Sequence, residues 1–105
     1  MAKTKTVPPR SKVRVADTWD LSPLFKSDAA WERSYRKLER EIDTFATFRG
    51  RLGTSAKVLR ACCDFEMGFN QLAERLGSYA FLKASEDVAN STYPVSYTHL
   101  TLPTN

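Results

Sequence analysis

The sequence is poor in histidine and cysteine, two residue types that often bind metals or take part in enzyme catalysis. Its 105 residues include one histidine, His99, and two adjacent cysteines, Cys62 and Cys63. Adjacent cysteines rarely pair with each other, because a disulfide needs Cα atoms farther apart than one peptide bond allows. Together these residues cannot supply the three or four suitably spaced ligands of a zinc site. We therefore predict no catalytic residue and no metal ligand in this chain.

Several longer motifs are absent as well. The sequence contains no run of 18 apolar residues, no secretory signal and neither of the common glycine-rich phosphate loops. The acidic residues Glu39, Glu41 and Asp43 could suggest a metal patch, but a solvated helix face is the simpler interpretation. Because no disulfide framework exists, we expect a cytoplasmic protein with no membrane partner.

Charge is unevenly distributed along the chain. The net charge is +4, yet five of the 16 basic residues lie before residue 15, where no acid occurs. The remaining 11 face all 12 acids. Residues 1–16 therefore read as a basic, disordered leader, and the folded part is close to neutral.

Helical periodicity dominates the middle of the chain. Four large apolar residues, Trp19, Leu21, Leu24 and Phe25, are expected to be buried, and they predict an extended strap that packs on the helices that follow. Ser27 suits the N-cap of a first helix, at about 28–49, and Thr54-Ser55 caps a second, at about 55–84. Apolar residues recur at alternating intervals of four and three along each helix. In the first helix they are Trp31, Tyr35, Leu38, Ile42 and Phe45; in the second they are Val58, Cys62, Phe65, Phe69, Leu72, Leu76 and Tyr79.

The short link 50–53, with Gly50 and Gly53, predicts an antiparallel helical hairpin of the all-α class. Cys62 falls on the apolar stripe as a small core residue, and Cys63 lies on its flank. Two helices cannot bury so many aromatic side chains, so the hairpin reads as a fragment of a larger helical lobe that occupies residues 17–94.

The last eleven residues differ from the rest. Residues 95–104 can be encoded by GTC TCT TAT ACA CAT CTG ACG CTG CCG ACG, which resembles the transposase-end adapter of short-read sequencing libraries. We expect residues 95–105 to be translated adapter, so that His99 carries no function. Without His99, catalytic systems that need a histidine base are excluded.

The order of landmarks resembles the oligoendopeptidase F family. They are WDLSPLF at 19–25, SDAAW at 27–31, FRGRLG at 48–53 and LGSYA at 76–80, followed by SED at 85–87 and NS at 90–91. The resemblance covers about residues 18–93. It implies the N-terminal part of a zinc oligopeptidase of the thimet-oligopeptidase type.

The resemblance implies that the whole enzyme binds zinc through an H-E-x-x-H motif on a helix farther along the sequence. This chain lacks that motif. It implies that the present lobe walls a channel for short peptides, that its partner is the missing catalytic domain, and that the fragment alone is inactive. The alternative is a small helical interaction module whose basic tail binds nucleic acid or a partner helix. Nucleic acid is the less expected ligand, because basic tails are common and unspecific.

Overall fold

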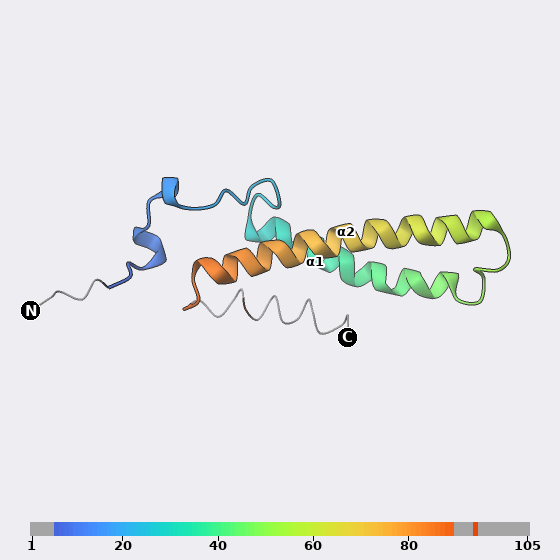
Figure 1. Ribbon diagram of the computed structural model, residues 1–105. Helices are drawn as coiled ribbons and strands as arrows, with labels where there is room; N and C mark the ends of the chain where they lie inside the picture. Colours follow the sequence, from blue (N-terminus) through green and yellow to red (C-terminus); the bar gives the residue numbers. More distant parts are fainter. Residues whose placement is uncertain (1–5, 90–93, 95–105) are drawn as a thin grey trace, which may run out of the picture.

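A computed structural model describes residues 6–89 and residue 94. Two α-helices, α1 (Asp28–Ile42) and α2 (Ala56–Glu86), run side by side in opposite directions (Figure 1). Three 3-10 helices accompany them: η1 (Arg10–Lys12), η2 (Val15–Asp17) and η3 (Asp43–Phe48). No strand occurs among the described residues. The predicted all-α hairpin is therefore confirmed.

Serine side chains begin both helices, as the sequence predicts. Ser27 Oγ accepts a hydrogen bond from the Ala30 amide at 3.1 Å, and Ser55 Oγ accepts one from the Val58 amide at 3.1 Å. Each serine has extended backbone angles and occupies the N-cap position. These bonds satisfy amides that have no partner within the first helical turn.

The first helix is shorter than predicted. Its α-helical part ends at Ile42, and the chain continues to Phe48 as η3 rather than as α-helix to residue 49. The segment holds two threonines and two phenylalanines, which are weak helix formers, and Thr47 Oγ1 donates to the Thr44 carbonyl at 2.7 Å. The second helix runs two residues beyond the predicted end, to Glu86.

The connection between η3 and α2 depends on one glycine. Gly50 has a φ of +73°, and no other described residue has a positive φ. Consecutive turns around it are closed by bonds from the Arg51 amide to the Phe48 carbonyl and from the Thr54 amide to the Arg51 carbonyl. A glycine reaches this backbone conformation without the steric cost that a side chain adds.

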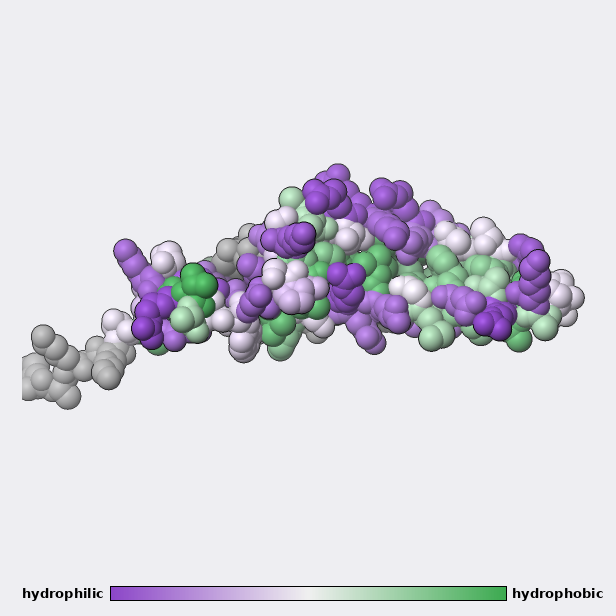
Figure 2. All heavy atoms as spheres, turned by 90° about the horizontal axis from the view of Figure 1, so that it is seen from above, coloured by the Kyte–Doolittle hydropathy of each residue, from purple (hydrophilic) through white to green (hydrophobic). Residues whose placement is uncertain are grey.

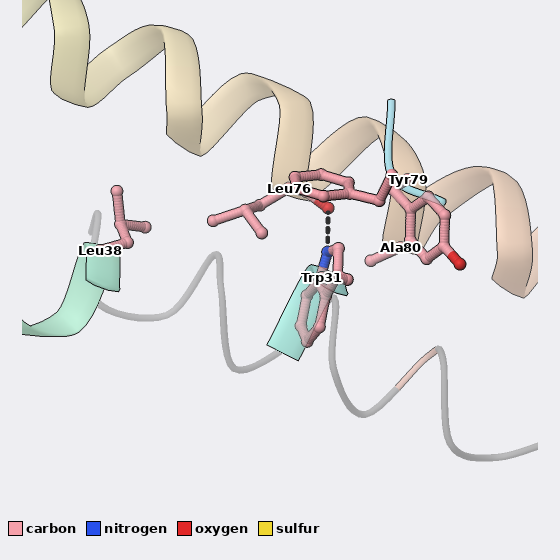
Figure 3. Packing of buried hydrophobic residues seen from close by; sticks show 6 residues of the cluster. Trp31, Leu38, Leu76, Tyr79 and Ala80 are labelled. Atoms are coloured by element: carbon pink, nitrogen blue, oxygen red, sulfur yellow. Dashed lines mark hydrogen bonds between the residues drawn. The ribbon is translucent and has the colours of Figure 1, made fainter. Parts of the chain in front are cut away.

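The core lies where α1 crosses the second half of α2. Its buried members are Phe25, Trp31, Leu38, Leu76, Tyr79 and Ala80. Leu76 has no exposed surface, and its carbonyl oxygen accepts a hydrogen bond of 2.9 Å from the Trp31 indole nitrogen (Figure 3). This bond joins residues 45 positions apart in sequence, and it fixes how α1 sits along α2.

The strap packs on the helices but is turned rather than extended. The Leu24 and Phe25 amides both donate to the Leu21 carbonyl, at 2.9 and 3.2 Å. Phe25 is buried and meets the Tyr79 ring edge-on, with centroids 5.5 Å apart. Trp19, by contrast, is 60% exposed, so the expectation that it would be buried is wrong. The turn directs Phe25 inward and leaves Trp19 outside it.

Removing the Leu76 side chain should destabilise the hairpin. Leu76→Ala leaves a cavity at a fully buried site, and we expect it to cost about 2–5 kcal/mol. The measurement is the urea midpoint of helical circular dichroism at 222 nm. Leu59→Ala is the matched control, because Leu59 lies on the same helix at 47% exposure. Equal effects of the two changes would contradict the observed core.

Gly50→Ala should strain the connection, whereas Gly53→Ala should not. An alanine at φ +73° costs about 1 kcal/mol, although no atom lies within 4 Å of the added Cβ. Gly53 has equally open surroundings and no positive φ, so alanine there should be neutral or slightly stabilising. Urea midpoints of the two variants test this difference, which would be refuted by an unchanged midpoint for Gly50→Ala.

Candidate functional site

Among the described residues, those considered as metal ligands do not come together. Cys62 is half-buried, Cys63 is exposed, and both are free thiols on α2. No group of three or more His, Cys, Asp or Glu side chains among residues 6–89 and 94 could hold a metal ion. His99 lies outside the described residues. The described donor set does not fit a zinc ion.

Glu39 and Glu41 on α1 and Asp43 on η3 do not form a group that could hold a metal ion. Glu41 forms an ion pair of 3.8 Å with Lys37, one turn away on α1. Glu39 and Asp43 are exposed. Burial raises the pKa of the Tyr35 hydroxyl, and the neighbouring Glu39 carboxylate raises it further. Tyr35 stacks on Trp31 with ring centroids 5.3 Å apart.

A phenylalanine cluster joins η3 to the first half of α2. Its members are Phe45, Phe48, Phe65 and Phe69. Phe45 meets Phe65 and Phe69 edge-on, with centroids at 4.9 and 5.1 Å, the arrangement that aromatic quadrupoles favour. Each of the four side chains keeps part of its surface in solvent. The cluster therefore resembles the edge of a core that a further element would complete.

A second apolar strip lies on the outer face of α2. Leu59, Cys63 and Met67 are spaced four residues apart, and all three are exposed, Leu59 by 47% and Met67 by 63%. At 100° per residue they lie well away from Leu76 around the helix. Figure 2 shows apolar surface interleaved with hydrophilic surface along the helical part of the molecule. A helix that is apolar on two sides is typical of one packed between neighbours.

The N-terminal segment contacts the far end of α2. Arg10 forms an ion pair of 3.2 Å with Glu86, whose side chain is only 11% exposed, and Arg14 pairs with Asp17 at 3.0 Å. A hollow of about 270 Å³ lies between η1, Trp19 and the end of α2. Two of the five cations of the predicted leader are thus paired with acids. The other three are Lys3, Lys5 and Lys12, of which the first two lie outside the described residues.

Known proteins with similar sequences are peptidases. The chain is 31% identical over 91 residues, 87% of its length, to oligopeptidase PepF of Bacillus subtilis. It is 31% identical over 80% of its length to the chromosomal oligoendopeptidase F of Lactococcus lactis subsp. cremoris, and 29% identical over 80% to the group B oligopeptidase PepB of Streptococcus agalactiae. In each case it covers 14% of the relative.

The chain is a homologue of the oligoendopeptidase F family. The predicted resemblance is therefore confirmed, for a chain that spans about one seventh of the length of these relatives. No family model matches the sequence. No solved structure matches it either. None of the described helices is both long enough and apolar enough to cross a membrane.

The landmarks of the family resemblance occupy distinct structural positions. WDLSPLF forms the turned strap, SDAAW begins α1 with the Ser27 cap, and FRGRLG spans the end of η3 and the Gly50 turn. LGSYA contains Leu76, Tyr79 and Ala80, half of the buried core. These four landmarks thus coincide with a cap, a turn or a core contact, and these features maintain the hairpin. SED at 85–87 lies at the end of α2, and NS at 90–91 lies outside the described residues.

The exposed apolar strip should make this chain associate or bind apolar dyes. We expect 8-anilinonaphthalene-1-sulfonate fluorescence to increase in its presence, or its sedimentation to depend on concentration. Leu59→Gln with Met67→Gln should reduce both signals, because the pair removes the largest exposed side chains of the strip.

The matched control for that pair is Lys57→Gln with Arg60→Gln, two exposed polar positions on the same helix. It should leave dye binding and association unchanged. A monomer with no dye binding and a sharp cooperative melt would show that the hairpin has no uncovered apolar surface.

Proposed function

We propose that this chain is a non-catalytic, N-terminal part of a zinc metallo-oligopeptidase, in which it walls the channel that admits short peptides. The observation that carries the proposal is the 31% identity to oligopeptidase PepF over 87% of the chain. The uncovered phenylalanine cluster and the outer apolar strip of α2 support it, because both suit a segment that packs on more protein.

The zinc and its ligands belong, in this proposal, to the remaining six sevenths of the enzyme. The contribution of this chain is steric and concerns which peptides reach the metal. The Trp31–Leu76 bond and the Phe25–Tyr79 contact hold the strap, α1 and α2 together as one unit, as the wall of a channel requires. We place the enzyme in the cytoplasm, consistent with two free thiols and no disulfide among the described residues.

A chimera tests the proposal directly. Residues 18–89 replace the segment that they match in the Bacillus subtilis relative, and hydrolysis of a quenched fluorescent peptide is followed. We expect the chimera to cleave the short peptide and to spare a folded protein of similar sequence, because the grafted hairpin restores the wall. The isolated chain with added zinc should show no turnover.

Leu76→Asp within the chimera is the matched disruption, since an unpaired charge at a fully buried site should unfold the hairpin. It should abolish hydrolysis or extend it to larger substrates, while Leu59→Asp on the exposed face serves as control for the added charge. Turnover by the isolated chain, or a chimera that is folded and zinc-loaded but indifferent to Leu76→Asp, would overturn the proposed role.

A further inference from the structure

A groove runs between the strap and α1. All the charged side chains that line it are basic. It measures about 540 Å³. Its lining includes five cations, Lys26, Arg33, Lys37, Arg40 and Arg75, and no acid. Pro23, Leu24 and Phe25 supply apolar surface beside them. The groove therefore combines an apolar side with a concentration of positive charge, in a chain whose part after residue 14 carries one more acid than it has bases.

This charge results from segregation around α1. Arg33, Lys37 and Arg40 are spaced four and three residues apart and share one face, whereas Glu32 and Glu39 lie on another. Where opposite charges are neighbours on this helix they pair and cancel in part, as Glu32 does with Arg36 and Glu41 with Lys37, but neither pair includes Arg33 or Arg40. Separation instead leaves a positive field on the side that faces the strap, where it attracts a complementary negative group.

Some cations of the groove already have partners within the part of the chain that the structure describes, and others do not. The Arg75 guanidinium donates to the Leu24 carbonyl at 2.6 Å and lies 4.9 Å from the centre of the Phe25 ring, so it shapes the groove. Lys37 pairs with Glu41, which does not line the groove. Among the described residues, no acid forms an ion pair with Lys26, Arg33 or Arg40, which leaves them available to a ligand.

The charge also argues against burial by the rest of the enzyme. The centres of permanent protein interfaces are depleted of charged residues, and the outer strip of α2 has the apolar composition that such interfaces favour. The groove has the opposite, charged composition. This composition suits a surface that stays in contact with water and binds a ligand reversibly. Because the groove is open and apolar Pro23 and Leu24 lie beside the cations, it suits an extended peptide better than a compact ion such as phosphate.

We propose that this groove binds acidic peptides, with Lys26, Arg33 and Arg40 as the contacts to aspartate or glutamate side chains. The inference rests on the proposed function, which makes peptides the ligands of the enzyme, and it adds a preference for negative charge on them. The groove then acts as a positioning and selection surface rather than as part of the chemistry.

Binding is measured by fluorescence anisotropy with a labelled hexapeptide that contains three glutamates, and with the same peptide carrying glutamine instead. The 105-residue chain should bind the glutamate peptide at least fivefold more tightly, and added salt should weaken that binding. Arg33→Gln with Arg40→Gln should weaken it about fivefold, as expected for the loss of two exposed charge contacts. Glutamine keeps the helix propensity of arginine, so circular dichroism should not change.

Arg60→Gln is the matched control, because Arg60 is an exposed arginine on α2 outside the groove. It should bind the glutamate peptide as the unchanged chain does. Backbone amide shifts in an NMR titration should concentrate at residues 24–26 and 33–40, which tests the location without any substitution.

The inference would be overturned by equal affinity for the two peptides, by equal losses in the groove variant and in Arg60→Gln, or by amide shifts elsewhere. Equal competition by inorganic phosphate or by duplex DNA, at matched charge concentration, would also overturn it, because the site would then be an unselective anion site. The proposed channel wall is tested separately by the chimera. If its quenched peptide is chosen without charged side chains, failure of one proposal does not imply failure of the other.

Discussion

The hydrogen bond from the Trp31 indole to the Leu76 carbonyl sets the geometry on which the other contacts depend. It is buried and joins the first turns of α1 to the second half of α2. A buried indole N–H without an acceptor is costly, so α1 has one favourable position along α2. That position also brings Tyr79 Oη to within 2.6 Å of Asp28 Oδ1 and places the Tyr79 ring against Phe25.

Helix length is the second constraint. α1 has 15 residues and α2 has 31, which corresponds to roughly 22 Å against roughly 46 Å. Because α1 is aligned with the second half of α2, the first half is left to η3 and its phenylalanines. A short 3-10 segment cannot cover that surface, and the phenylalanine cluster stays partly exposed. The unfinished appearance of the hairpin follows from this mismatch.

Much of the fold could be predicted from the sequence because its signals are local. Apolar spacing located both helices, and serines at 27 and 55 marked their starts. The end of α1 could not be predicted. The apolar spacing continues through Phe45, although the backbone changes from α-helix to 3-10 helix at Asp43. The sequence predicts burial of Trp19, because large apolar residues favour burial. The turn at 21–25, however, depends on contacts with Arg75 and Tyr79, which are distant in sequence.

The basic groove was missed for a similar reason. The cations of α1 are visible in the sequence as a solvated face, but Lys26 and Arg75 join them only through folding. The spacing of Arg33, Lys37 and Arg40, with the acids on another face, was the available signal.

The two tryptophans occupy opposite environments, since Trp31 is 7% exposed and Trp19 is 60% exposed. An aqueous quencher can therefore reach one indole and not the other. Intrinsic tryptophan fluorescence therefore reports whether the two helices are in contact. In the folded chain, a collisional quenching curve should separate an accessible tryptophan from a protected one, without any attached label.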